Sequence, residues 1–323
     1  MKKIVVRVAI ALVALVALAV LGLIVKFYAL SPKSRPPQAM TAPSTPEAIA
    51  RGKYLANHVA VCLACHSEID ESRPGDAIAE GRIGSGRDFG DMPGPAHLRA
   101  KNLTPDKETG IGAWSDGEIV RAMREGVSRD GRALFPQMPY LTYGHMLGDA
   151  DALAIVAYLR TLAPIKNDPG RTEVRFPVSM FVRAAPAPVE TPAPPPPPAT
   201  DKLARGKWLL KVALCNECHD SVNERYEKIP GKALAGGMKF PIPGKGVAIA
   251  PNITSDKATG IGSYSDEDLR RVFEEGKNKS GRSLYVMPWS HYKGLTSEDK
   301  DALFAALREV APIANVVPPS EIH

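Results

Sequence analysis

All four cysteines of this chain lie in two copies of one short pattern. Residues 62–66 read Cys-Leu-Ala-Cys-His, and residues 215–219 read Cys-Asn-Glu-Cys-His. Two residues between the thiols place both sulfur atoms along one turn of helix, and the histidine follows directly. Such a group could bind a metal ion, exchange a disulfide or form thioether bonds to the vinyl groups of a haem.

This pattern occurs in three kinds of site: a zinc site, a redox-active dithiol and a haem attachment site. A closed zinc site needs a fourth ligand, and no other cysteine exists to supply one. A thioredoxin-like dithiol lies near a βαβ pattern, which this sequence lacks. Cys-x-x-Cys-His is the attachment signature of c-type haem. We therefore predict two haem c groups, each bound through two thioethers and a histidine that ligates the iron: Cys62, Cys65 and His66, and Cys215, Cys218 and His219.

One methionine in each half is predicted to be the second iron ligand. Met138 and Met287 are each followed by proline and an aromatic residue, 72 and 68 residues after the respective histidine. A methionine that fills a gap in the core is the alternative. The rival ligands His145, Met146 and His291 are interpreted as surface or supporting groups. His/Met ligation would leave no open position on the iron and would raise its reduction potential.

The chain contains an internal repeat. Residues 102–112 and 252–262 agree at eight of eleven positions, and Ala-Pro-Ile ends both 157–165 and 305–313. Each half therefore has one Cys-x-x-Cys-His and one Met-Pro in the same order. The proline-rich residues 185–200 are typical of an extended spacer, which could hold the two halves apart or allow them to dock.

The elements between these motifs are expected to be helices joined by Gly- and Pro-rich loops, without convincing strands. Thr45 is a predicted N-cap with Pro46 in the first turn. Ser115 or Asp116 is predicted to begin a helix that Gly126 ends. A further helix is predicted from Asp149 to just before Pro164.

The first thirty residues predict export. Val8–Val25 is an uninterrupted apolar run that could nearly cross a membrane, and it follows Lys2 and Lys3. We favour an uncleaved anchor over a cleaved signal peptide, because the run is long and the following residues make a poor cleavage site. The positive cluster predicts a cytoplasmic N-terminus. The segment carries most of the formal charge of +6, so the near-neutral remainder argues against nucleic-acid binding.

On these motifs, the chain resembles class I c-type cytochromes in duplicate. More closely, it resembles dihaem cytochromes that act as membrane-bound electron acceptors for periplasmic dehydrogenases. The resemblance implies an all-α fold of two tandem cytochrome c domains after a transmembrane helix, with terminal helices crossing at Gly52 and Gly206 and an aromatic partner at Tyr158 in the first domain. It also implies haem propionates near two polar loops, which contain Asn102, Thr104, Asn252 and Thr254, although loop capping is an equal alternative.

The predicted organisation has six parts. These are a membrane anchor (1–30), a Pro/Ser-rich stalk (31–46), a first cytochrome c domain (47–165), a Pro-rich linker (166–200), a second cytochrome c domain (201–313) and a tail (314–323). The anchor would place a single-pass protein in the bacterial cytoplasmic membrane, with both haem domains in the periplasm.

The predicted function is electron transfer. The chain would relay electrons from a periplasmic dehydrogenase or quinol-oxidising complex to a downstream cytochrome or terminal oxidase, as a carrier or electron-transfer subunit rather than as a catalyst. The alternative is a dihaem enzyme, peroxidase-like or thiosulfate-oxidising, with one haem open or able to exchange its ligand. A haem sensor is a third possibility, but no cytoplasmic output domain is evident.

Overall fold

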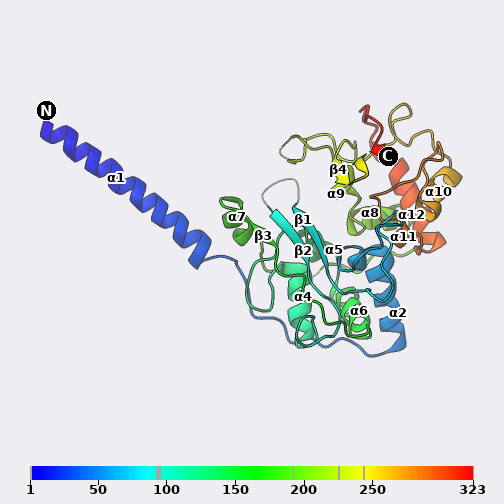
Figure 1. Ribbon diagram of the computed structural model, residues 1–323, viewed down its shortest axis with the longest axis horizontal. Helices are drawn as coiled ribbons and strands as arrows, with labels where there is room; N and C mark the ends of the chain where they lie inside the picture. The colour runs from blue at the N-terminus through cyan, green and yellow to red at the C-terminus, as the bar shows by residue number, and fades with distance from the viewer. Residues whose placement is uncertain (1, 92–95, 192, 225, 243, 323) are drawn as a thin grey trace.

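Two helical domains pack side by side, and one long helix projects away from them (Figure 1). The computed structural model describes residues 2–91, 96–191, 193–224, 226–242 and 244–322. The projecting helix is α1 (Lys2–Ile24), which continues as the π-helical turn η1 (Val25–Ala29). This segment has the length and composition of a membrane-spanning anchor or of a signal sequence, and none of its apolar window is buried by protein.

The two domains contain equivalent helices in the same order, which agrees with the sequence repeat. The first domain contains α2 (Pro46–Tyr54), the π-helical η2 (Leu55–Val59), α3 (Cys62–Cys65), α4 (Asp116–Glu125), α5 (Tyr140–Met146) and α6 (Asp149–Leu159). The second contains α8 (Lys202–Val212), α9 (Cys215–His219), α10 (Asp266–Glu275), α11 (Trp289–Tyr292) and α12 (Ser297–Arg308).

Local sequence signals set the helix ends. The Thr45 hydroxyl accepts a hydrogen bond from the Ala48 amide at the start of α2, as predicted. Ser115, rather than Asp116, is the N-cap of α4, where it forms a reciprocal capping box with Glu118. Gly126 ends α4 with φ of 71°, a left-handed conformation that glycine adopts without strain.

The first and last helices of each domain cross at a glycine. α2 packs against α6, and α8 packs against α12. A Cβ added to Gly52 would lie 1.7 Å from the Ala154 carbonyl oxygen, and one added to Gly206 would lie 1.9 Å from the Ala302 carbonyl oxygen. The backbones are therefore too close for any larger residue. Ala306, the counterpart of Tyr158, contributes to this close approach in the second domain.

Gly52→Ala is expected to destabilise the first domain by about 1–3 kcal/mol, the usual cost of overpacking. The new methyl group would meet a backbone carbonyl, which cannot rotate away. Thermal unfolding of the holoprotein would measure the loss. Ala50→Ser, which adds one heavy atom at an exposed position of the same helix, is the matched control, and equal melting temperatures for the two variants would contradict the close crossing.

The structure is mostly helical, as predicted, but each domain also carries a small antiparallel sheet that the expectation of an all-α fold without strands did not include. The first contains β1 (Arg87–Asp91), β2 (Ala96–Ala100) and β3 (Glu173–Val174), and the second contains β4 (Lys239–Ile242), β5 (Gly246–Ile249) and β6 (Glu321–Ile322). These strands are short, and a bulge interrupts the β1–β2 pairing between Asp88 and Gly90. They therefore lack the regular alternation that identifies longer strands. β3 and β6 come from the linker and the tail, so both segments close onto the domains before them.

The stalk does not stand free of the first domain. Arg35 donates hydrogen bonds to the Glu125 carboxylate at 2.6 Å and to the Val189 carbonyl at 2.9 Å. The Ala42 amide donates to Asp116 at 2.8 Å. Glu125 also accepts a hydrogen bond from the Val189 amide at 3.2 Å. The stalk and the linker are thus held together at the end of α4.

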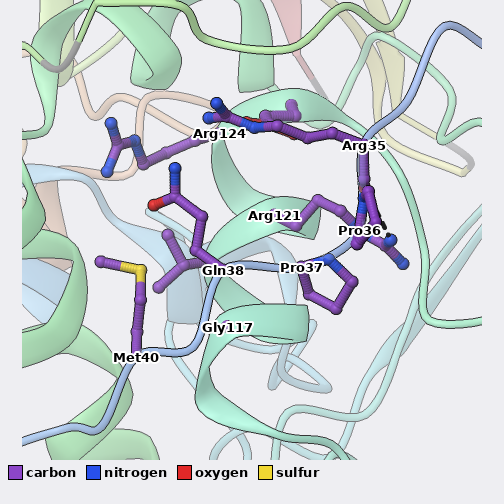
Figure 2. Close-up of a pocket in the computed structure, with 10 residues that line it drawn as sticks. Arg35, Pro36, Pro37, Gln38, Met40, Gly117, Arg121 and Arg124 are labelled. Carbon is purple, nitrogen blue, oxygen red and sulfur yellow. Dashed lines mark hydrogen bonds and ion pairs between the residues drawn. The ribbon is translucent and has the colours of Figure 1, made fainter.

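Figure 2 shows the small pocket formed where the stalk crosses α4. Arginine side chains from both segments, Arg35, Arg121 and Arg124, border it. None of the predicted haem ligands lines this pocket.

Candidate functional site

Each Cys-x-x-Cys-His forms a tight helical turn that begins after a strained residue. Val61 precedes α3 with φ of 42°, and Leu214 precedes α9 with φ of 60°. Both are left-handed conformations, which branched or bulky residues rarely adopt. Such strain persists only where the surrounding structure requires it, and it often marks functional sites. The same strain before both motifs indicates that the direction of these turns is fixed by the fold.

The four thiols are partly accessible but lie in desolvating surroundings. All are free. Cys65 is exposed and the other three are half-buried, yet the surrounding protein raises the pKa of Cys65 to about 11 and those of Cys62, Cys215 and Cys218 to about 12. Cys62 and Cys215 pack against the apolar core. Partly accessible thiols in such surroundings suit a large, mostly apolar group attached through the sulfur atoms.

Both histidines are oriented by a backbone carbonyl. Nδ1 of His66 lies 2.7 Å from the Lys101 oxygen, and Nδ1 of His219 lies 2.9 Å from the Pro251 oxygen. A carbonyl can only accept, so Nδ1 carries the proton and Nε2 keeps its lone pair for a metal. Burial lowers the pKa of both imidazoles, which favours the neutral form that binds metals. Both sets of residues therefore fit a haem with histidine as one axial ligand.

The predicted methionine ligands lie just before the short helices α5 and α11. Met138 and Met287 are half-buried against the core. Their carbonyls accept hydrogen bonds from the Tyr140 and Trp289 amides, each at 2.8 Å. The two Met-Pro segments therefore have the same local conformation.

The rival ligands have other surroundings. His145 is exposed. His291 is buried, with Nε2 3.0 Å from the Asp76 carbonyl oxygen of the other domain. The Met146 carbonyl accepts a hydrogen bond from the Trp208 indole at 3.0 Å, also across the two domains. His291 and Met146 thus belong to the domain contact, in keeping with their interpretation as supporting groups.

In each domain a tyrosine that was not among the predicted site residues connects the methionine segment to the cysteine segment. The Tyr143 hydroxyl donates to the Ala60 carbonyl, and the Tyr292 hydroxyl donates to the Ala213 carbonyl, each at 2.7 Å. Both tyrosines are buried, and burial raises each pKa well above 10. Each tyrosine lies five residues after its methionine, a spacing shared by both halves that could have identified the pair.

The polar loops form internal hydrogen bonds. The Asn102 carboxamide donates to the Ile165 carbonyl at 2.7 Å and accepts from the Thr104 amide and hydroxyl at 2.8 and 2.7 Å. Asn252 makes the equivalent bonds to Ile313 and Thr254. All four Asn and Thr side chains are buried. These contacts support the loop-capping interpretation, since they occupy the groups that the resemblance places near the propionates.

The Cys-x-x-Cys-His segments of both domains lie near the domain contact. After burial, the largest cause of the raised pKa of Cys218 is the Cys65 thiol of the other domain. Cys65 also acts on the buried Tyr292. Cys65 is therefore near enough to the second domain to affect Cys218 and Tyr292 electrostatically.

Hydrogen bonds hold the domain contact in place. The Ser290 hydroxyl donates to the Gly75 carbonyl at 2.6 Å, and Nδ1 of His58 lies 2.8 Å from the His291 carbonyl oxygen. The Tyr54 hydroxyl donates to Asp299 at 2.6 Å. Apolar residues of both domains share one buried core cluster. Of the two arrangements that the proline-rich linker could allow, the structure shows the docked one.

Acid is expected to weaken this contact through Asp299. Burial alone would raise the pKa of Asp299, but hydrogen bonds from Arg205 and Tyr54 outweigh it and hold the pKa below its ordinary value. A lowered folded-state pKa stabilises the protein above the ordinary value of about 3.9 and loses this contribution as pH falls through the folded-state pKa. The hydrogen-exchange protection factors of amides around Tyr54, which are corrected for the intrinsic pH dependence of exchange, should therefore be constant from neutral pH to about pH 5 and fall below about pH 4.

Asp299→Asn should show the lowered protection factors already at neutral pH and little further change in acid. Asp301→Asn is the control, because Asp301 pairs with Arg270 within its own domain. Exchange that responds equally to both substitutions would contradict the role of Asp299.

Known proteins with similar sequences include cytochrome subunits of dehydrogenases and a diheme cytochrome c-type protein. No family model matches the chain. It is 31% identical over 262 residues to the fructose dehydrogenase cytochrome subunit of Gluconobacter japonicus, covering 79% of this chain and 50% of the relative. It is 27% identical over 239 residues to the cytochrome c subunit of the quinone alcohol dehydrogenase of Gluconobacter oxydans (strain 621H), covering 71% and 47%. The chain spans about half the length of these two relatives.

A third relative matches over most of both chains. The diheme cytochrome c-type protein of Cereibacter sphaeroides is 26% identical over 256 residues, which cover 78% of this chain and 82% of the relative. This chain has two helical domains, each with one Cys-x-x-Cys-His. That arrangement is the one expected for a c-type cytochrome with two haem sites. The predicted resemblance to dihaem c-type cytochromes and to the cytochrome subunits of dehydrogenases is confirmed.

Proposed function

We propose that this protein is a membrane-anchored electron carrier with two covalently bound haem c groups. Cys62, Cys65 and His66 would hold one group, and Cys215, Cys218 and His219 the other. Met138 and Met287 would be the sixth iron ligands. Each haem would supply one-electron redox chemistry at a reduction potential raised by the soft thioether ligand. Full axial ligation favours a carrier over an enzyme that binds substrate on iron.

The protein's own residues would prepare each site for this role. The carbonyls of Lys101 and Pro251 hold the histidine rings with Nε2 free. Tyr143 and Tyr292 fasten the methionine segments to the chain just before the cysteines. Ligands held in this way would move little when the charge on iron changes, and a site with little reorganisation suits rapid electron exchange.

The observation that carries the proposal is the docking of the two domains through residues that follow the first Cys-x-x-Cys-His and the second predicted methionine ligand. Electron tunnelling falls steeply with distance, so a relay needs its two centres close and fixed. The Gly75 and Asp76 carbonyls, which follow the first Cys-x-x-Cys-His, accept hydrogen bonds across the contact from Ser290 and His291, which follow Met287. Electrons entering one domain would thus pass within the chain to the other.

The relatives suggest the partners. Two of them are named as cytochrome subunits of dehydrogenases. This chain would accordingly accept electrons from a periplasmic dehydrogenase or quinol-oxidising complex and pass them to a downstream cytochrome or oxidase. The helix α1 would be an uncleaved single-pass anchor in the bacterial cytoplasmic membrane, with both domains in the periplasm. Packing of η1 against residues 178–184 of the exported part supports retention of the anchor.

The relay can be tested by separating the domains. A Cβ on Gly294 would lie 2.2 Å from the His58 ring of the other domain, so Gly294→Leu should force the contact open. We expect electron equilibration between the haems, followed after flash reduction of the holoprotein, to slow at least several-fold. Ala150→Leu, at an exposed helix position, should leave the rate unchanged. An unchanged rate in an opened Gly294→Leu protein would contradict the relay.

A further inference from the structure

We propose that α7 (Val178–Ala184), together with the preceding Phe176, is a second membrane contact that lies among the lipid headgroups beside the anchor. This inference rests on the proposed retention of α1 as a transmembrane helix. This segment of the linker takes no part in haem binding or in the proposed electron relay.

The short helix is fastened to the end of the anchor. The Phe181 ring meets the Phe27 ring edge to face, with centroids 5.6 Å apart. Nε of Arg183 donates to the Phe27 carbonyl at 3.0 Å, and its guanidinium lies 5.2 Å from the centre of the Tyr28 ring. These contacts fix the position of α7 relative to η1, and Figure 1 shows α7 at the side of the domain that faces the end of α1.

The length of the anchor sets the depth of this segment. The 18 residues Val8–Val25 span about 27 Å as a helix, close to the roughly 30 Å hydrocarbon core of a bilayer. Lys26, Phe27 and Tyr28 must then lie at the membrane–water interface. Because Phe181 and Arg183 bind Phe27 directly, α7 must lie at the same level.

The exposed side chains of the segment suit that level. Phe176 is 73% exposed and Phe181 is 61% exposed. Among the described residues, these are the two exposed phenylalanines of the chain. Residues 174–186 also contain Arg175 and Arg183 and no acidic residue. Aromatic rings beside basic groups are typical of segments that lie in the interface of a membrane.

The bilayer is therefore a better occupant for this face than another protein subunit. The face is continuous with a transmembrane helix, and its depth follows from direct contact with that helix. With the stalk bound to α4 through Arg35 and Glu125, the first domain would be held against the membrane rather than at the end of a flexible tether. The first haem would then keep one height above the lipid.

A spin label at position 176 tests this contact in the full-length holoprotein. Phe176→Cys would be labelled with a nitroxide in lipid nanodiscs that contain anionic and zwitterionic lipids, with the haems reduced. The haem-bound cysteines would not react. Accessibility to oxygen relative to a water-soluble nickel complex should be several-fold higher at 176 than at a label on Val316→Cys, which is 85% exposed elsewhere on the chain. Arg183→Gln should lower the ratio at 176, and Arg175→Gln should change it less.

Each other result overturns the inference in a distinct way. Equal aqueous accessibility at 176 and 316 in protein that remains in the nanodiscs would show that α7 is in water, and the anchor would stand. Protection of position 176 from both reagents would show that protein covers the face. Failure of the holoprotein to remain in nanodiscs, with residues 1–30 absent by mass spectrometry, would overturn the anchor and the inference together.

Discussion

Replacing Cys62 and Cys65 together with alanine is expected to halve the covalently bound haem of the protein. Both thioethers of the first site would be lost, and His66 alone would hold a haem only by coordination. The second site has its own cysteines, its own histidine and its own orienting carbonyl at Pro251. It should therefore mature independently.

The ratio of covalent haem to protein after acid–acetone extraction measures this effect. The mirror variant, Cys215→Ala with Cys218→Ala, should give the same half-content, with the remaining haem on a peptide that contains Cys62 and Cys65. Loss of haem from both domains in either variant would show that the docked halves mature as one unit. Full haem content would contradict the assignment of the cysteines.

Met138→Ala and Met287→Ala are expected to change the spectrum and the potential of one haem each. Removing the thioether removes the methionine-to-iron charge-transfer absorption of that site and the preference of sulfur for reduced iron. The reduction potential of the affected haem should fall by a sizeable part of the roughly 0.8 V range that axial ligands span. The other haem should keep its potential.

Spectroelectrochemical titration of each variant separates the two haems. Met146→Leu is the control for the first domain, because Met146 packs against the core and its backbone carbonyl, not its sulfur, binds Trp208. A Met138→Ala protein with both charge-transfer contributions intact would rule out Met138 as a ligand. His145 and Met146 would then need the same test.

Features with a strong local signal could be predicted from the sequence. The Cys-x-x-Cys-His motif prescribes its own chemistry, so six predicted haem-binding residues needed no knowledge of the fold. Thr45 begins α2 through a short-range hydrogen bond, and Gly126 ends α4 through its left-handed backbone conformation. The resemblance placed Gly52 and Gly206 at helix crossings, and the structure brings each within contact of a backbone carbonyl.

Features that depend on distant backbone atoms could not be predicted. The carbonyls that orient His66 and His219 belong to Lys101 and Pro251, and any residue type can provide a carbonyl. β3 and β6 are two-residue strands whose partners define them. The domain contact likewise uses backbone groups of Gly75 and Asp76. The linker composition allowed both docking and separation, and only the packing of particular surfaces decides between them.

The EPR spectrum of the oxidised holoprotein, recorded with its visible spectrum, tests whether the chain binds two haems with both axial positions of each iron filled. We expect two low-spin ferric signals and charge-transfer absorption equivalent to two methionine-ligated haems. A high-spin signal, or absorption equivalent to one methionine-ligated haem, would contradict this expectation. That result would leave an iron open to substrate and would favour a dihaem enzyme that acts on peroxide or sulfur compounds.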